Sequence, residues 1–173
     1  MHKLIIFDVD GTLRRCTVPG QVCPNEDGEW ELLPGVKEKL AKITWGSPAK
    51  GKTAMGIASN QAGVAKGYVS EETADRLIFG TVRRAFGFVP VAGSVQKCPH
   101  DPASDCKCRK PHPLMLERLM RFWEVEPEET LFVGDMESDQ AAARNAGCDF
   151  AWAREFFNQD YSVRRGKAHS LSG

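Results

Sequence analysis

Apolar runs that end at polar residues recur along the chain. The three clearest runs are 4–7 before Asp8, 53–58 before Ser59, and 130–133 before Gly134. Weaker runs at 89–95 and 148–153 raise the expected number of strands to about five. A continuous apolar run is typical of a parallel strand buried on both faces, so we predict such strands, each delivering polar residues at its carboxyl end.

Helical spacing of apolar residues separates these strands. Residues 36–43 and 116–123 place apolar side chains on one helical face, and Ser70 is a typical N-cap before a further helix. Gly147 is a typical helix stop. Strands that alternate with helices predict an α/β fold, a Rossmann-like parallel sheet with helices on both faces. Ligands bind such sheets at the carboxyl ends of the strands.

Glycine and proline mark the connecting segments. Residues Arg14–Glu31 contain two prolines and two glycines, so we predict an irregular loop over the carboxyl edge of the sheet. Residues 48–52 are predicted to form a turn. From about residue 157 onward the chain is polar and basic, which is typical of a loosely ordered terminus. A length of 173 residues predicts one domain over residues 1–173.

Composition narrows the class of protein. The chain is 42% apolar and 27% charged, as in globular proteins, and its 23 basic residues balance 23 acidic ones. A net charge of zero gives no overall attraction to nucleic acid. No run reaches the length of a membrane span and the first residues do not resemble a signal peptide, so a cytoplasmic protein without a membrane partner is expected. We also expect a monomer.

Two carboxylates follow the first strand. Asp8 and Asp10 flank Val9, and Gly11 permits a sharp turn after them. Such a pair can direct one carboxylate at phosphorus and the other at the leaving oxygen, as phosphate ester hydrolysis requires. An ordinary turn or a simple metal site would also explain the two residues taken alone.

The ordered set of motifs resembles the haloacid dehalogenase superfamily of phosphohydrolases. The residues that match are Asp8-Val9-Asp10-Gly11-Thr12, Ser59, Lys110 and Asp135. The resemblance implies that Asp8 is the nucleophile and a Mg²⁺ ligand and that Asp10 is the acid and base, with its backbone carbonyl on the metal. It also implies that Ser59 and Lys110 contact the phosphoryl group, that Asp135 completes the Mg²⁺ shell, and that Asp139 supports it.

A cysteine-rich segment precedes Lys110. Cys98, His100, Cys106 and Cys108 lie within eleven residues, and three thiolates with one imidazole can close a tetrahedral zinc site. Because no coordination position would remain open, the predicted Zn²⁺ is structural. Separate, unliganded thiols are the alternative. Cys16 and Cys23 lie in the 14–31 loop, where incidental thiols, a second metal or a disulfide are all compatible with the sequence.

The zinc segment narrows the resemblance. Cys98-Pro99-His100 followed by Cys106-Lys107-Cys108-Arg109-Lys110-Pro111 is similar to the D-glycero-D-manno-heptose 1,7-bisphosphate phosphatases and the histidinol phosphatases. Both families have a capless fold with a zinc-binding loop. Residues 59–67 resemble the heptose enzymes, whereas the short gap within the zinc segment is closer to the histidinol phosphatases, and Leu114 and Met136 depart from the heptose pattern.

Several substrates fit this pattern. A small sugar phosphate, first of all the heptose bisphosphate, is our interpretation, with Thr12, Asn60, Gln61 and Arg109 at the substrate. Arg109 is free to grip a second anion with its planar fork, unless it pairs with Asp105 or caps the zinc thiolates. Histidinol phosphate is the next alternative, followed by a polynucleotide 3′-phosphate. A phosphate-binding module without catalysis is the last, although both catalytic aspartates are present.

Overall fold

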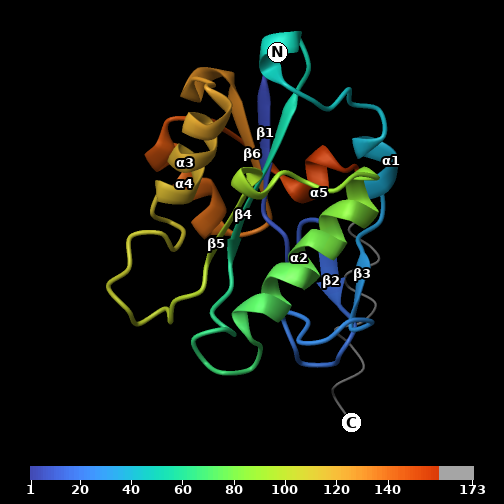
Figure 1. Cartoon of the computed structure of the whole chain (residues 1–173), viewed down its shortest axis with the longest axis vertical. Coiled ribbons are helices and arrows are strands. Elements are labelled where there is room, and N and C mark those ends of the chain that lie inside the picture. Colours follow the sequence, from blue (N-terminus) through green and yellow to red (C-terminus); the bar gives the residue numbers. More distant parts are fainter. Residues whose placement is uncertain (160–173) are drawn as a thin grey trace.

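The computed structural model describes residues 1–159, and Figure 1 shows a central sheet between two groups of helices. The sheet has five parallel strands in the order β5-β4-β1-β6-β7. Their bounds are β1 Leu4–Phe7, β4 Ala54–Asn60, β5 Val95–Cys98, β6 Thr130–Gly134 and β7 Asp149–Trp152. The tail expected from about residue 157 lies almost wholly outside the described residues.

Strand register brings the polar residues after β1 and β6 to one edge. Phe7 pairs with Ile57 of β4 and with Val133 of β6, so these positions are level in the sheet. The Asp8 N–H then donates to the Val133 carbonyl at 3.0 Å, which extends the pairing by one residue. The first catalytic candidate is therefore held by the sheet rather than by a free loop.

Helices cover both faces of the sheet. Their bounds are α1 Val36–Leu40, α2 Glu71–Phe86, α3 Leu114–Trp123, α4 Glu137–Ala146 and α5 Ala153–Phe156, with short 3-10 turns η1 Pro48–Lys50, η2 Ala92–Ser94 and η3 Pro127–Glu129. Ser70 caps α2 by accepting the Thr73 N–H at 3.1 Å, and Gly147 ends α4 with φ of 76°, as predicted. Among the described residues, no helix is both long and apolar enough to cross a membrane.

Alternation along β1 divides the core into two clusters. Ile5 and Phe7 pack with residues of α1, α2 and α5, whereas Leu4 and Ile6 pack with residues of α3 and α4. All four side chains are 7% exposed or less. The short apolar run therefore holds together both layers of helices, as expected for a strand with two buried faces.

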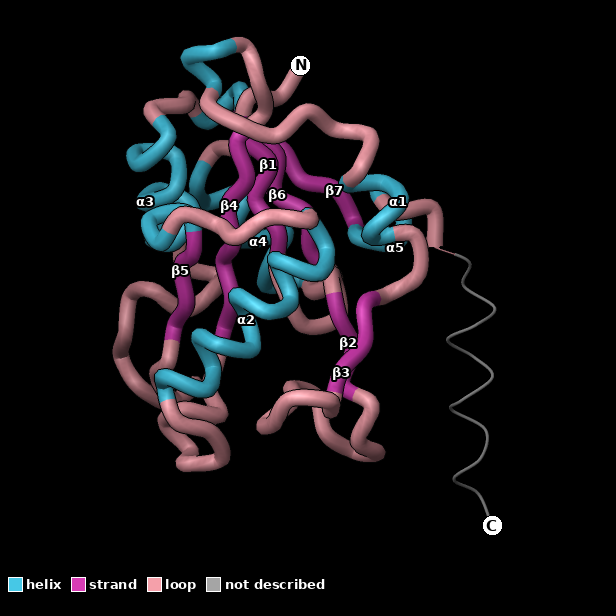
Figure 2. The backbone as a smooth tube through the Cα atoms, turned by 45° about the vertical axis from the view of Figure 1, so that its right-hand side comes forward, coloured by secondary structure: helices cyan, strands magenta, loops and turns pink. Residues whose placement is uncertain are grey.

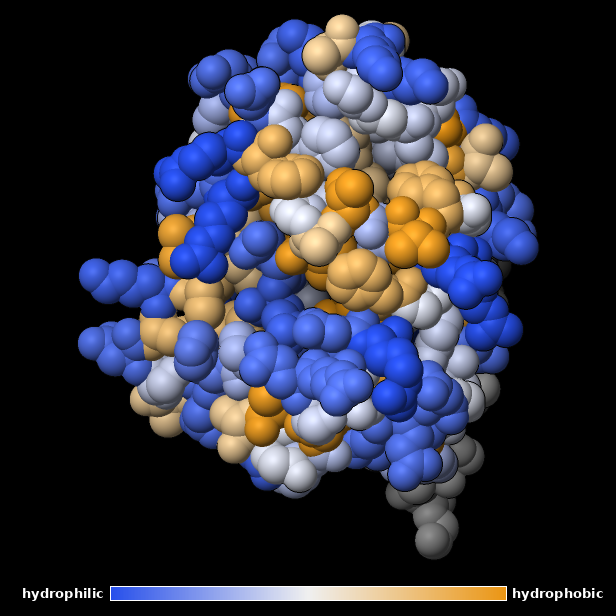
Figure 3. Space-filling view, viewed as in Figure 1, coloured by the Kyte–Doolittle hydropathy of each residue, from blue (hydrophilic) through white to orange (hydrophobic). Residues whose placement is uncertain are grey.

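The position of β5 corrects one sequence prediction. The apolar run 89–95 predicts a strand, but β5 begins only at Val95. Pro90 has no N–H to donate to a strand ladder, and Val89 and Val91 are 66% and 55% exposed. Segment 87–94 instead crosses the face seen in Figure 1, where Figure 3 shows apolar side chains gathered.

A hairpin corrects a second prediction. The segment Arg14–Glu31 is not irregular throughout, because β2 Arg14–Cys16 pairs antiparallel with β3 Trp30–Leu32. The Thr17 N–H also donates to the Glu29 carbonyl at 2.7 Å, so the pairing extends to the base of the loop. Figure 2 shows this hairpin beyond the carboxyl ends of the sheet strands, with loop 17–29 at its tip.

Candidate active site

A cleft of about 960 Å³ lies at the carboxyl edge of the sheet. It is lined by the residues that follow β1 and β6, by the loops around residues 15–25 and 60–68, and by Pro102, Arg109 and Lys110. Asp8, Asp10, Lys110, Asp135 and Asp139 all face it. The structure therefore brings the predicted charged residues from three distant parts of the sequence into one site.

Asp8 and Lys110 form the buried centre of this site. The Lys110 Nζ donates to Asp8 Oδ1 at 2.8 Å, to the Ala58 carbonyl at 2.8 Å and to Asp139 Oδ1 at 2.7 Å. Lys110 is only 3% exposed. Burial opposes its charge, but the charges of Asp8 and Asp139 and their hydrogen bonds outweigh that effect and raise the pKa of Lys110. The lysine is thus held as a cation against the nucleophile candidate.

Asp10 is held from its own side of the cleft. Its carboxylate accepts hydrogen bonds from Arg14 Nε at 2.8 Å, from Arg14 Nη2 at 3.3 Å and from Gln61 Nε2 at 3.0 Å. The thiol of Cys23 also contacts this carboxylate, and burial, followed by the charge of Asp10, raises the pKa of Cys23. The acid and base candidate is therefore fixed in place before a substrate arrives.

Asp135 lies beside the tight turn after β1. Thr12 Oγ1 donates to Asp135 Oδ1 at 3.3 Å and to Asp8 Oδ2 at 3.2 Å. A Cβ at Gly11, whose φ is 84°, would lie 2.1 Å from Asp135 Oδ2, so only glycine fits this turn. Burial, together with the charge of Asp8, raises the pKa of Asp135 from 3.8 to about 8. A divalent cation would relieve this crowding of carboxylates.

The acidic cluster has the chemistry of a Mg²⁺ site. Oxygens of Asp8, Asp135 and Asp139 lie within 4.8 Å of one another. Both oxygens of Asp139 are engaged, because Oδ1 contacts Lys110 and Oδ2 accepts the N–H groups of Asp135 and Met136 at 3.1 and 3.0 Å. Asp139 therefore orients the loop that carries Asp135, and its support of the metal stays a prediction.

The predicted polar contacts to substrate lie at different depths. Ser59 is 1% exposed and its Oγ accepts from Gln61 Nε2 at 2.7 Å, so both side chains, like Thr12, lie behind the cleft wall. Asn60 lines the cleft and exchanges hydrogen bonds with the backbone of Lys110 at 3.1 and 3.3 Å. These contacts fix the shape of the site, and direct binding of substrate by these residues stays a prediction.

Arg109 lines the same cleft next to Lys110. Its Nη1 is buried, and among the described residues it has no hydrogen-bond partner. This nitrogen therefore makes neither of the alternative contacts considered from the sequence, with Asp105 or with the zinc thiolates. A buried guanidinium nitrogen without a partner is a ready site for an anion.

Cys98, His100, Cys106 and Cys108 converge as predicted. The distance between the sulfurs of Cys98 and Cys106 is 3.7 Å, and His100 Nδ1 lies 3.5 Å from Cys98 Sγ and 3.2 Å from Cys108 Sγ. A tetrahedron with metal–sulfur bonds of about 2.3 Å has sulfur–sulfur edges of about 3.8 Å. Burial raises the pKa of Cys98 to about 12, whereas the Arg109 N–H and neighbouring side chains lower that of Cys106 to about 6, against its desolvation. The four ligand atoms therefore have the spacing of a zinc site.

Sequence patterns did not identify four further residues of the cleft. Arg15 of β2, Lys66 and Tyr68 of the loop after β4, and Ser138 of α4 line it. Arg14 was also missed, because its place beside Asp10 depends on the packing of α2 against the turn after β1. Loop residues such as Tyr68 gave no signal either, because their approach to the cleft depends on loop conformation.

Comparison with known proteins first defines the class. A family profile described as HAD-hydrolase-like matches residues 107–156, which include Lys110 and Asp135. Together with the parallel sheet and the carboxylates at its strand ends, this match defines the class of haloacid dehalogenase-like hydrolases. The α/β fold class predicted from the sequence is confirmed.

Relatives with curated names narrow the class to a family. The D-glycero-beta-D-manno-heptose-1,7-bisphosphate 7-phosphatase of Bordetella bronchiseptica is 32% identical over 146 residues, 84% of this chain and 77% of that protein. The enzyme of the same name from Pseudomonas putida is 30% identical over 148 residues, 84% of this chain and 78% of that protein. The chain belongs to this family of phosphatases, as its sequence motifs indicated.

A solved structure supports the same family. The D,D-heptose 1,7-bisphosphate phosphatase from B. bronchiseptica, complexed with magnesium and phosphate, matches with a TM-score of 0.70 and 28% identity. The match covers 92% of this chain and 87% of that chain. The backbone likeness thus extends over nearly all the elements that build the cleft.

Proposed function

We propose that the chain hydrolyses the 7-phosphate of D-glycero-beta-D-manno-heptose 1,7-bisphosphate through an aspartyl-phosphate on Asp8. The main evidence for this type of reaction is that Asp8, Asp10 and Lys110 converge at one edge of the sheet. Asp8 provides a carboxylate oriented by Lys110 and Thr12, and Asp10 provides a second carboxylate close by. The names of the relatives support the choice of substrate.

The residues divide the work of hydrolysis between them. An oxygen of Asp8 attacks phosphorus, the bond from phosphorus to the sugar oxygen breaks, and protonated Asp10 gives its proton to that oxygen. Asp10 then takes a proton from water as the water oxygen attacks the phosphoryl group, and the bond to Asp8 breaks to release inorganic phosphate. Lys110 keeps a positive charge beside the reacting oxygens throughout.

Two metal sites complete this proposal. Asp8, Asp135 and the Asp10 backbone carbonyl would hold Mg²⁺, which when bound neutralises the phosphoryl oxygens. Cys98, His100, Cys106 and Cys108 would hold a structural Zn²⁺, as their spacing indicates. Lys110 follows the last zinc ligand by two residues, so this site would fix the segment that aims the lysine.

The surroundings of Arg109 favour a bisphosphate over a monophosphate as the substrate. Lys110 is committed to Asp8 and Asp139, whereas the buried Arg109 Nη1 has no partner among the described residues and belongs to a residue of the cleft wall. A second phosphate on the sugar would provide its missing acceptor. Histidinol phosphate carries an ammonium group there instead, which the guanidinium would repel.

The remaining proposals concern the state of the protein. We propose one catalytic domain that acts as a cytoplasmic monomer on small phosphorylated substrates. The balanced charge of the sequence supports a small substrate over a nucleic acid.

The substrate test compares wild type with Arg109→Met. If Arg109 binds the second phosphate, the variant loses kcat/KM on the heptose bisphosphate by about 10- to 100-fold, as for a lost charged hydrogen bond, and loses little on the heptose 7-phosphate. Asp8→Asn serves as the inactive control, because its amide keeps the shape but cannot act as nucleophile. Equal losses on both sugars, or a wild-type preference for histidinol phosphate, would contradict the proposed substrate.

A further inference from the structure

Arg14 is a charged side chain buried under the cleft rather than exposed in it. It is 1% exposed, and the residues that line the cleft do not include it. Its guanidinium reaches Asp10 on one side and α2 on the other. A buried arginine at this depth must satisfy its donors within the protein, and its partners therefore indicate what it does.

The guanidinium fork grips both oxygens of Asp10. Arg14 Nε donates to Asp10 Oδ1 at 2.8 Å, and Nη2 donates to Oδ2 at 3.3 Å. Gln61 Nε2 adds a third bond to Oδ2 at 3.0 Å. Two parallel bonds from one planar group fix both the position and the plane of the carboxylate, which a single bond would not do.

The other end of Arg14 is anchored in α2. Arg14 Nη1 donates to the Leu77 carbonyl at 3.0 Å and to Thr81 Oγ1 at 2.9 Å, and Thr81 in turn donates to the Leu77 carbonyl at 2.8 Å. The ring of Trp30 lies 6.0 Å from the guanidinium carbon. Asp10 is thus tied through Arg14 to a helix of 16 residues, and not only to the turn that carries it.

We propose that Arg14 is the positioning residue for Asp10, and that it sets the carboxylate at the angle needed for proton transfer to the leaving oxygen. The proposal rests on the proposed function, since it assigns a role within that reaction. A buried ion pair adds little stability compared with apolar residues of similar size. The two hydrogen bonds from this buried arginine to a catalytic candidate therefore point to orientation of that group.

Two esters with different leaving groups isolate this role. A sugar oxygen needs a proton to leave, whereas the phenolate of 4-nitrophenyl phosphate leaves without one. Arg14→Met is expected to lose kcat/KM on the heptose bisphosphate by about 10²-fold or more, and to lose less than about 10-fold on the aryl ester. Arg14→Lys keeps the charge but not the planar guanidinium. Its kcat/KM on the heptose bisphosphate is expected to lie between those of Arg14→Met and wild type.

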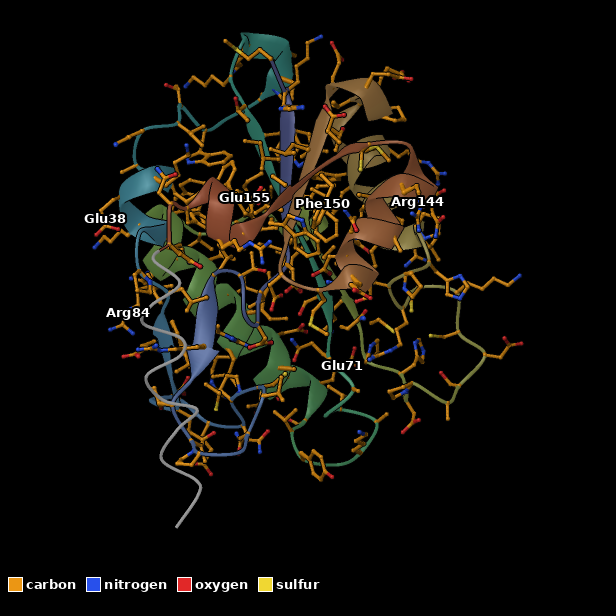
Figure 4. The ribbon with its side chains drawn as sticks, turned by 180° about the vertical axis from the view of Figure 1, so that it is seen from behind. Glu38, Glu71, Arg84, Arg144, Phe150 and Glu155 are labelled. Atoms are coloured by element: carbon orange, nitrogen blue, oxygen red, sulfur yellow. The ribbon has the colours of Figure 1, made fainter. Side chains whose placement is uncertain are left out.

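The ratio of the two kcat/KM values does not depend on how much of a preparation is folded, because both esters report the same active molecules. Thr81→Val removes one anchor of Arg14 and leaves Asp10 untouched, so a smaller shift of the same ratio, about 2- to 10-fold, is expected even if Arg14→Met folds poorly. Arg84→Met is the matched control. Arg84 is exposed, as Figure 4 shows, and lies 5.2 Å from the same Trp30 ring without contacting Asp10.

Each outcome decides between the two proposals. Equal losses on both esters, or full activity of Arg14→Met on the sugar ester, would overturn the role of Arg14. A wild type that hydrolyses neither ester would contradict the proposed function instead. If wild type hydrolyses only the sugar ester, a fall in kcat with KM unchanged within about twofold supports positioning, whereas a change in KM alone overturns it.

Discussion

At the scale of single residues, charge is distributed unevenly across the cleft floor. Lys110 contacts Asp8 and Asp139, and Arg14 contacts Asp10, whereas Asp135 accepts a hydrogen bond from the neutral Thr12. Burial and the nearby charge of Asp8 therefore raise the pKa of Asp135 to about 8. In the protein without bound metal, ionisation of the Asp135 carboxyl is therefore disfavoured.

The stability of the metal-free protein should accordingly depend on pH. Because the pKa of Asp135 is raised above its unfolded value of 3.8, the folded state holds more protons than the unfolded chain between about pH 4 and pH 8, and stability falls as pH rises through that range. We expect the thermal unfolding midpoint in chelator to drop by a few degrees from about pH 5 to about pH 8. Saturating Mg²⁺ should raise the unfolding midpoint more at about pH 8 than at about pH 5.

Asp135→Asn provides the control for this measurement. The amide cannot ionise, so the drop in chelator should shrink and the response to Mg²⁺ should weaken. Wild-type midpoints that rise over the same range in chelator would show that Asp135 ionises as an ordinary carboxyl does.

Sequence motifs identified the charged residues that face the cleft better than the residues that support them. Asp8, Asp10, Lys110 and Asp135 follow patterns of type and order, and the structure brings them together. Arg14 could not be predicted as the partner of Asp10, because its role depends on α2 lying against the turn after β1. Its burial arises from tertiary packing that no local pattern records.

At the scale of elements, the sequence predicted the buried strands of the sheet better than its edge strand and the hairpin. The runs that became β1, β4 and β6 are buried on both faces, so their apolar pattern was unambiguous. The edge strand β5 carries polar residues such as Gln96 and Lys97, and the apolar run before it was mistaken for a strand. The β2–β3 hairpin was missed because three-residue strands are too short to show a period.

The zinc segment is the element whose order should depend most on a ligand. Residues 101–105 and 107 are mostly exposed, so apolar burial gives this segment little support. Cys106→Ser should therefore lower the zinc content from about one per chain toward zero, and lower kcat by about 10-fold or more as Lys110 loses its alignment. Elemental analysis and steady-state kinetics on the same preparation measure both effects.

Cys148→Ser is the matched control, since that thiol lies outside the cluster and contacts the Ala143 carbonyl. It should retain both zinc and activity. A wild-type protein without zinc after expression in zinc-supplemented medium would refute the metal assignment, and a zinc-free Cys106→Ser with full activity would refute its link to Lys110.

At the scale of the whole molecule, one aromatic cluster joins the sheet to α2, to α5 and to the loop after α1. Phe7 is fully buried and its ring meets those of Trp45, Phe86, Phe156 and Phe157 at centroid distances of 5.6 to 6.2 Å. It also directly precedes Asp8. The same residue thus belongs to the core and to the base of the active site.

Phe7→Ala should cost about 3–5 kcal/mol of unfolding free energy, because it removes a large ring from a closed core. Phe122→Ala, at a residue 47% exposed, should cost about 1 kcal/mol or less. Urea unfolding followed by tryptophan fluorescence measures both. Equal costs for the two variants would show that the aromatic cluster is not central to stability.

The β2–β3 hairpin joins a segment that lines the cleft to the part of the chain that forms the core. Loop 17–29 lines the cleft through residues such as Gln21 and Asn25, yet none of its residues belongs to either core cluster. Its ends are already paired next to each other at Cys16 and Trp30. Since doubling a loop costs only about 0.6 kcal/mol in closure entropy, evolution or a protein engineer can exchange this segment for one of another length and chemistry. Such an exchange removes the contact of Cys23 with Asp10 but leaves Asp8, Lys110 and Asp135 in place, so the lining of the cleft can be varied while these charged groups stay.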